Sequence, residues 1–436
     1  MPALRAIRSR RLPFLAALIL GGSIAACREG STPPPGPETD RSASQAATGA
    51  GPSDAAAPAA PAAALDPSTL AGALVALTAS PAGVSNRANR FGLVDGRRET
   101  LWVTTDGANI SDWTLSPKRD QVAYRAIQRA PGEPAIADEQ LVVQDLTPEA
   151  RPRIVASADT ALARLVGFAW SPDGSSLAYG RQTGGLPGQE PALAARPAVW
   201  ALHAVAVGGD AGPTVDERVL WQSQAVSPGR PLSLLAWDPE SGRAALLEQA
   251  ADSGMLAGVQ LIDTRSGDRL AELETRAGTQ TWAEARTAPS GRLLLLAEAG
   301  ESEAHLHRID LAAGRQSDLA LDEGSQARRL LWDAAGKRAA WTQAPLPTGA
   351  DGAPIALGIG WADVEAAGAT QRLPITGQDA APLAFSPDGR YLLVGETDDS
   401  FSPGWTRLVV HALDGSARGT LGWTLPEDSW AVYWTD

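Results

Sequence analysis

The stretch Phe168-Ala169-Trp170-Ser171-Pro172-Asp173-Gly174, followed closely by Leu177-Ala178-Tyr179, decides the fold of this 436-residue chain. Proline presets the backbone of the first turn residue, the aspartate bonds back onto the turn, and glycine adopts the left-handed conformation that closes it. The flanking apolar runs are too short for helices and are bounded by turn residues, so we interpret them as strands. The unit is predicted to be a β-hairpin.

The same hairpin recurs along the chain. A second clean copy is Leu383-Ala384-Phe385-Ser386-Pro387-Asp388-Gly389, and five degraded copies fill the intervals. A weaker hairpin follows in most repeats, so each unit of about fifty residues carries four strands, which is the size of one propeller blade. With the position of Ser171 as reference, the anchors are Ser116, Ser171, Asp238, Ala288, Asp333, Ser386 and Thr435.

Counting the anchors predicts the number of blades. The last anchor lies one residue from the C-terminus, so Ser429–Thr435 can supply only the innermost strand of a blade. Apolar runs at 73–79, 90–94 and 100–104 offer the missing three strands. We therefore expect an all-β, seven-bladed propeller that is closed by N- and C-terminal strands in one blade, which leaves no open sheet edge at the seam.

The repeated Ser-Pro-Asp-Gly hairpins resemble the WD40-like repeats of TolB-type β-propellers over about residues 70–436. The resemblance implies a protein- or ligand-binding propeller of the bacterial envelope. Prolyl-oligopeptidase relatives carry a similar propeller but need a hydrolase domain with a Gly-x-Ser-x-Gly elbow. The sequence has no such elbow and no residues left over for that domain, so this class is excluded.

The N-terminus has the pattern of an export signal. Arg5, Arg8, Arg10 and Arg11 precede an apolar run over residues 12–26, which is too short for a permanent span. The run ends Ile24-Ala25-Ala26-Cys27, which resembles the bacterial lipobox, and Cys27 is the single cysteine of the chain. The resemblance implies that residues 1–26 are removed and that Cys27 carries lipid on the outer face of the cytoplasmic membrane or on the outer membrane.

A spacer is expected between the lipid and the propeller. Residues 27–67 consist mostly of Pro, Ala, Gly, Ser and Thr without apolar periodicity, a composition that cannot bury enough surface to offset its ordering entropy. Residues 68–436 form the predicted propeller. We expect the spacer to enter the ring at its closing seam, in the blade where the chain ends meet.

The net charge and the absence of certain motifs argue against several kinds of ligand. The formal charge of −13 becomes −17 once residues 1–26, with four arginines and no acid, are removed, which argues against nucleic-acid binding. No phosphate-cradling loop or dinucleotide fingerprint is present, so no cofactor is expected. His305 and His307 share a strand face, but no third ligand follows nearby, so no metal site is predicted. We explain Trp170, Trp237, Trp332 and Trp434 by packing between blades.

A binding face is predicted from the long insertions, which fall between the second and third strands at 80–88, 128–138, 182–196, 344–353 and 398–403. Such loops emerge together on one face of a propeller. Aligning the repeats places a candidate binding rim at Arg181, Gln249, Glu298, Gln343 and Glu396. We expect a binding or scaffold module for an envelope protein or a glycan or peptide ligand. The alternative is a propeller-type hydrolase or lyase with acidic residues lining the central channel.

Overall fold

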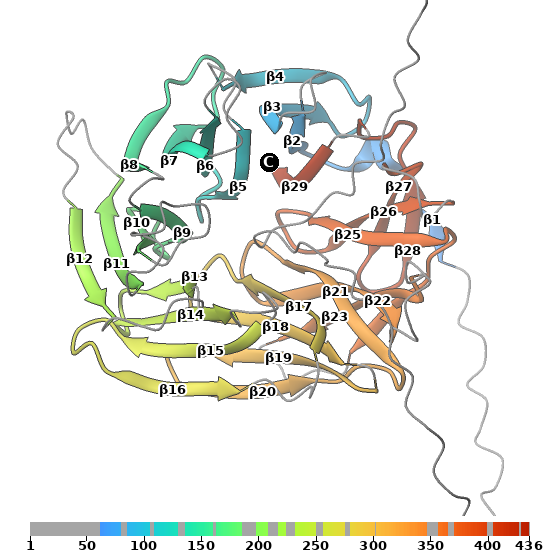
Figure 1. Ribbon diagram of the computed structural model, residues 1–436. Coiled ribbons are helices and arrows are strands. Elements are labelled where there is room, and N and C mark those ends of the chain that lie inside the picture. Colours follow the sequence, from blue (N-terminus) through green and yellow to red (C-terminus); the bar gives the residue numbers. More distant parts are fainter. Residues whose placement is uncertain are drawn as a thin grey trace, which may run out of the picture.

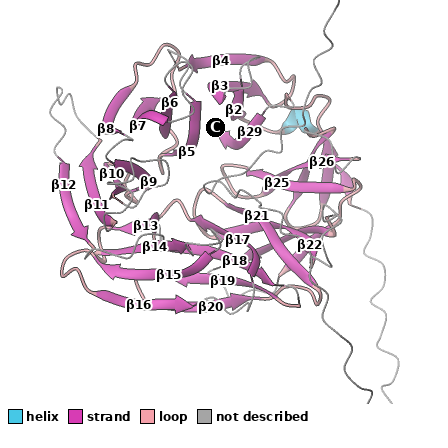
Figure 2. Cartoon of the chain, viewed as in Figure 1, coloured by secondary structure: helices cyan, strands magenta, loops and turns pink. Residues whose placement is uncertain are grey.

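The computed structural model describes residues 62–79, 85–104, 109–129, 136–159, 163–184, 198–207, 217–223, 232–249, 256–274, 280–300, 302–346, 356–364, 370–398, 404–426 and 429–435. Within them, seven antiparallel sheets stand around a central axis (Figure 1). Strands dominate this part of the chain, and one short 3₁₀ turn, η1 (Pro67–Thr69), precedes the second strand (Figure 2). The predicted seven-bladed, all-β propeller is confirmed.

Six blades are each built from four consecutive strands, with the innermost strand first. Their bounds are as follows: β5 (Asn109–Leu115), β6 (Gln121–Arg129), β7 (Ile136–Asp145) and β8 (Arg153–Asp159); β9 (Ala163–Trp170), β10 (Ser176–Thr183), β11 (Val199–Ala206) and β12 (Glu217–Gln222); β13 (Leu232–Asp238), β14 (Arg243–Gln249), β15 (Leu256–Asp263) and β16 (Arg269–Glu274). They continue with β17 (Gln280–Thr287), β18 (Leu293–Gly300), β19 (Ala304–Asp310) and β20 (Arg315–Leu319); β21 (Ser325–Trp332), β22 (Arg338–Pro345), β23 (Gly358–Asp363) and β24 (Gln371–Leu373); β25 (Asp379–Phe385), β26 (Tyr391–Thr397), β27 (Arg407–Ala412) and β28 (Ala417–Thr420).

The two chain ends meet in one blade, which we call the closing blade. It places β29 (Ser429–Thr435) innermost, followed by β2 (Ala73–Ala79), β3 (Ser85–Gly92) and β4 (Arg98–Val103). β29 pairs antiparallel with β2 over most of its length. The predicted closure is therefore confirmed, and the C-terminus lies near the centre of the ring (Figure 1).

One further strand was not expected from the sequence. The short β1 (Ala63–Ala64) pairs in parallel with β28 as a fifth strand of the last blade. The amide of Leu65 donates to the Arg418 carbonyl at 2.8 Å, and the absence of a side chain at Gly419 admits this approach, because a Cβ there would lie 2.4 Å from the Leu65 carbonyl oxygen. The chain thus first pairs with the β25–β28 blade, so the prediction that the spacer enters the ring in the closing blade is wrong.

The hydrophobic core of the propeller consists of separate clusters between the blades. Seven apolar clusters are buried, and each contains residues of two neighbouring blades. Trp170, Trp237, Trp332 and Trp434 each lie in a different cluster, which confirms that they pack between blades. Each blade is thus stabilised chiefly by its neighbours, because burial of apolar surface is the main favourable term in folding.

The Ser-Pro-Asp-Gly motif forms the predicted turn between the first and second strands. The Gly174 amide donates to the Ser171 carbonyl at 2.9 Å, and Gly174 has a φ of 72°. The Ser171 hydroxyl donates to Asp173 at 2.6 Å, and the carboxylate also accepts the Ser175 amide. These bonds lower the pKa of Asp173 to about 2, so the carboxylate stays ionised and the turn remains locked at neutral pH.

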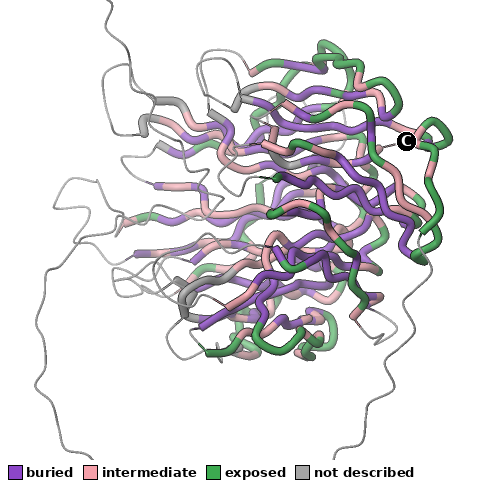
Figure 3. Tube along the Cα trace, turned by 90° about the vertical axis from the view of Figure 1, so that its right-hand side faces the viewer, coloured by how far each residue is buried: buried purple, intermediate pink, exposed green. Residues whose placement is uncertain are grey.

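The two faces of the ring differ. Connections between first and second strands, and between third and fourth strands, lie on one face; those described are tight turns, while most of the β11–β12 and β23–β24 connections lie outside the described residues. Connections between second and third strands start and end on the other face, where the first strands begin. We call this other face the loop face, and most residues of the five long insertions lie outside the described part of the chain. The turns of the opposite face are largely exposed, whereas the strand centres are buried (Figure 3).

Candidate functional site

The lipid-attachment residue predicted from the sequence lies outside the described residues. Cys27 and the whole span 1–61 precede the first described residue, so lipidation and the spacer stay predictions. Among the described residues, no helix has the length and apolar character needed to cross a membrane.

The five candidate rim residues lie on equivalent strands of five different blades. Each belongs to the second strand of its blade, near the end that reaches the loop face: Arg181 on β10, Gln249 on β14, Glu298 on β18, Gln343 on β22 and Glu396 on β26. The propeller therefore distributes them around the axis and does not bring them together. The side chain of Gln249 lies outside the described part.

Three rim residues are buried and hydrogen-bonded within their own blades. Glu298, Gln343 and Glu396 each expose 1% of their surface or less. The Gln343 side-chain amide donates to the Ser325 hydroxyl of the adjacent strand at 3.0 Å. Satisfied partners are what buried polar groups require, so these contacts account for the burial. A binding role for the rim stays a prediction.

Glu298 takes part in a chain of three titratable groups. The Nε2 atom of His307 on β19 lies 3.1 Å from Glu298 Oε1, and its Nδ1 atom lies 2.7 Å from Asp318 Oδ1. Burial disfavours the charged imidazole, but the hydrogen bonds and negative charges of Glu298 and Asp318 outweigh it and raise the pKa of His307. The buried carboxylate thus has a partner that becomes cationic as the pH falls.

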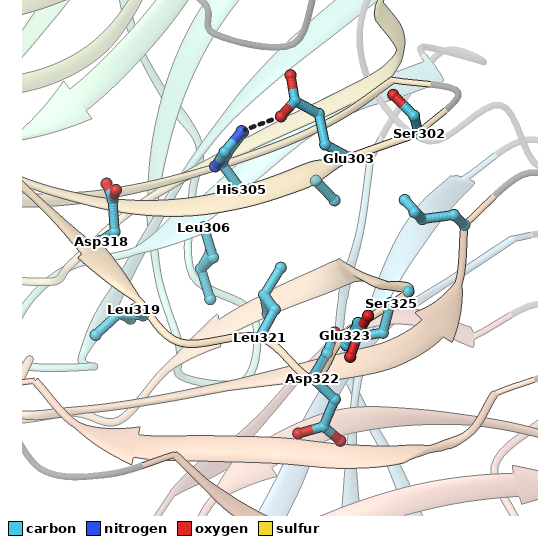
Figure 4. A pocket seen from close by; sticks show the side chains of 13 residues that line it. Ser302, Glu303, His305, Leu306, Asp318, Leu319, Leu321, Asp322, Glu323 and Ser325 are labelled. Carbon is cyan, nitrogen blue, oxygen red and sulfur yellow. Dashed lines mark hydrogen bonds and ion pairs between the residues drawn. The ribbon is translucent and has the colours of Figure 1, made fainter. Parts of the chain in front are cut away.

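A hollow of about 300 Å³ opens beside this chain, between the β17–β20 and β21–β24 blades (Figure 4). Four carboxylates and His305 surround it above a floor of leucines, the acids being Glu303, Asp318, Asp322 and Glu323. Asp318 bonds His307, Asp322 pairs with Arg372 at 3.4 Å, and Glu303 lies 3.6 Å from His305. His305 and His307 stack in parallel on one strand face, as predicted. Nowhere in the described ranges do three or more potential ligands group as a metal site.

Sequence reasoning missed a belt of ionic contacts along the inner strands. The Glu284 carboxylate on β17 accepts the backbone amides of Arg329 and Leu330 at 2.7 and 2.9 Å, where β21 departs from regular pairing. Arg329, with a φ of 53°, then forms a two-pronged ion pair with Asp379 on β25. Glu284 therefore supplies acceptors that the strand irregularity needs.

This belt bears on the acidic residues considered for a channel enzyme. Asp112 on β5 pairs with Arg125 at 2.7 Å, just as Asp379 pairs with Arg329. Burial raises the pKa of Glu284, while the amides that it accepts favour its ionised form. These three inner-strand acids thus have structural bonds within or between blades. No periodicity in the sequence marks the bonds of Glu284 and Asp379, because they join strands 45 to 50 residues apart.

Comparisons with known proteins concern the fold. No protein-family model matches the chain, and no curated protein matches it in sequence. The solved TolB of Acinetobacter baumannii is 17% identical over 80% of this chain and 78% of that chain, with a TM-score of 0.39. The periplasmic gluconolactonase of Pseudomonas aeruginosa is 16% identical over 84% and 99%, with a TM-score of 0.49. An oligogalacturonate lyase in complex with manganese is 14% identical over 72% and 79%, with a TM-score of 0.45. The chain is a seven-bladed β-propeller with distant structural similarity to TolB and to other propellers, enzymes among them.

Proposed function

We propose that this protein is a lipid-anchored, extracytoplasmic propeller that serves the cell envelope as a binding or scaffold module. Its partner would be an envelope protein or a glycan or peptide ligand. The N-terminal arginines, the short apolar run and Cys27 support export and lipidation. The Pro- and Ala-rich spacer supports a propeller held away from the membrane, where it can reach a partner.

The observation that supports a binding role is the difference in connection length between the two faces of the ring. Long insertions occur at one place in the blade, and all connect strands at the loop face. The described connections of the opposite face are short turns whose backbone groups bond to each other. Loops presented by a rigid scaffold are the usual carriers of recognition. The enzyme alternative lacks such support, since the inner-strand acids Asp112, Glu284 and Asp379 already have structural partners.

The anchoring part of the proposal is tested by Cys27→Ser. We expect the variant to lose incorporation of a labelled fatty acid and to move from the membrane to the soluble fraction, with an unchanged unfolding temperature. Ser31→Ala, in the spacer, is the matched control and should keep both the label and the membrane location. Equal labelling of wild type and Cys27→Ser would overturn lipidation at this residue.

The binding part is tested by photo-crosslinking in intact membranes. A photoreactive residue is placed at Glu323 or Asp398, both exposed on the loop face, and at Ser266 or Asp414 in turns of the opposite face as controls. We expect a discrete crosslinked product from the loop-face positions only. Products from the turn face alone, or from neither face, would contradict the proposed binding face.

A further inference from the structure

A second hollow opens at the perimeter of the ring. It has a volume of about 360 Å³ and lies between the β5–β8 and β9–β12 blades. Residues 154–157 of the outermost strand β8 form one wall, and Tyr179 and Arg181 of β10 with Glu217 of β12 form the other. We call it the perimeter groove. Its size falls within the range of small-ligand sites.

Arg181 provides a positive charge in this groove. Tyr179 and Arg181 lie two residues apart on β10, so both side chains leave the same face of the strand. Arg181 is half-buried and forms neither a hydrogen bond nor an ion pair with any described residue. Its charge acts on both Tyr179 and His203, which places it near them. Its five N–H donors are therefore available to a ligand.

Glu217 provides the opposite charge and is held in one orientation. Its Oε1 atom accepts the Tyr179 hydroxyl at 2.6 Å and lies 2.5 Å from His203 Nδ1. Its Oε2 atom accepts nothing from the described residues, and the side chain is 38% exposed. One oxygen is thus fixed by the protein, while the other remains open to the groove.

The two groups that hold Glu217 do not cancel its charge. Burial raises the pKa of Tyr179 far above neutrality, so the hydroxyl stays protonated and donates. Burial also lowers the pKa of His203, despite the opposing charge of Glu217. The imidazole is therefore neutral at pH 7 and leaves the charge of Glu217 in place. Within the described part of the chain, the groove thus carries one cation and one anion that no opposite charge neutralises.

The strand register sets the distance that a ligand must span. Glu217 lies two strands outward from Arg181 and, in register, opposite Leu177, four residues back along β10, so about 16 Å separates the two Cα atoms. A free amino acid carries its two charges on one carbon and is too short to reach both. Two or three extended residues cover about 7 to 10 Å. Ile154, which is 53% exposed on the facing wall, offers an apolar contact for a side chain between the two ends.

We propose that the perimeter groove binds a small zwitterion of the size of a di- or tripeptide, with its carboxylate on Arg181 and its ammonium on Glu217. A simple anion would be repelled by Glu217, and a simple cation would be repelled by Arg181. A ligand that carries both charges therefore fits the groove best. The strongly acidic chain repels anions in general, which makes the local arginine decisive for the carboxylate. The groove shares Arg181 with the candidate rim but lies on other blades than the crosslinking positions Glu323 and Asp398, so either proposal can fail alone.

The test is calorimetric titration of the purified protein with trialanine, with N-acetyl-trialanine and with trialanine amide. We expect trialanine to bind and each blocked peptide to bind about tenfold more weakly, because each lacks one charge-assisted contact. Equal binding of trialanine and its amide, or no binding of any of the three, would overturn the proposal.

Two arginine variants assign the effect to the groove. Arg181→Gln should bind trialanine about tenfold more weakly and should no longer distinguish it from the amide. Arg218→Gln makes the same change in charge at an exposed neighbour of Glu217 on β12 and should bind as wild type does. Unfolding temperatures of both variants equal to wild type show that the fold is kept. Unchanged discrimination in Arg181→Gln would exclude the groove as the site.

Discussion

Glu396 allows a sharp test of how burial governs an ion pair in this propeller. Its carboxylate is fully buried and accepts the Thr376 hydroxyl at 2.6 Å, Arg418 at 2.9 Å and Arg407 at 3.4 Å. Arg407 also contacts Asp398, at the shorter distance of 2.8 Å, but that carboxylate is 65% exposed. The same arginine thus has one buried and one exposed partner.

We expect Glu396→Gln to destabilise the protein by about 2 to 3 kcal/mol. The amide keeps the shape but removes the charge, and its NH₂ group must face at least one of the donors. Charge-assisted bonds contribute about 1.5 to 3 kcal/mol each, and neutral ones about half of that. Both arginines are about one-third exposed and can be hydrated after the change, which keeps the loss below the full value for a broken buried pair.

Asp398→Asn is the matched control and should cost less than about 0.5 kcal/mol, because exposed ion pairs are weak and screened by salt. The two variants are compared by urea unfolding followed by tryptophan fluorescence, with free energies extrapolated to water. The expected Glu396→Gln loss corresponds to about a 30- to 150-fold change in the folding equilibrium. Equal losses in the two variants, or a larger loss in Asp398→Asn, would refute the reasoning that burial outweighs distance.

Three further predictions concern single side chains and use the same unfolding assay. The acids beside His307 raise the pKa of this histidine in the folded state. Protonated His307 therefore stabilises the fold fully below its unfolded pKa of about 6.5, and this contribution is lost as the pH rises through the folded-state pKa. The free-energy gap between wild type and His307→Gln should therefore be larger at pH 6 than at pH 9, and a gap that widens with pH contradicts this. Gly174→Ala should destabilise the protein by about 1 kcal/mol because of its positive φ alone. Gly167→Ala should destabilise it clearly more, because the added Cβ would also clash with the Leu234 carbonyl oxygen. Equal losses would show that the structure relaxes to relieve this clash. Trp332→Phe should cost about 1 kcal/mol more than Trp237→Phe, since the Trp332 indole donates to a carbonyl at 2.9 Å, whereas the Trp237 indole has no hydrogen-bond partner among the described residues. The reverse order would contradict this prediction.

Several features of the site could not be predicted because they depend on contacts between strands. The run Ser85-Asn86-Arg87 looks polar enough for a loop, and a strand was expected only from residue 90, yet β3 begins at Ser85. The reason lies in Asn89, which is buried, donates to the Thr78 hydroxyl at 2.5 Å and accepts from Arg98 and Thr100 on the next strand. A polar residue can occupy a strand core when its neighbours satisfy it, which no single segment reveals.

By itself the sequence determined the repeat unit, the number of blades and their closure. Turn chemistry and strand patterning act over a few residues, so the Ser171 and Ser386 hairpins and their spacing specify a blade wherever they occur. The tertiary structure alone decided what the side chains at the strand ends contact. Aligned repeats placed Arg181 and Glu396 at equivalent positions, yet one borders the perimeter groove and the other is fully buried. Burial and charge balance at these positions depend on residues two strands away in the same sheets, Glu217 beside the groove of Arg181 and Arg418 as the partner of Glu396. Such long-range pairing leaves no periodic trace in the sequence, and it also brings β1 onto β28 across some 350 residues.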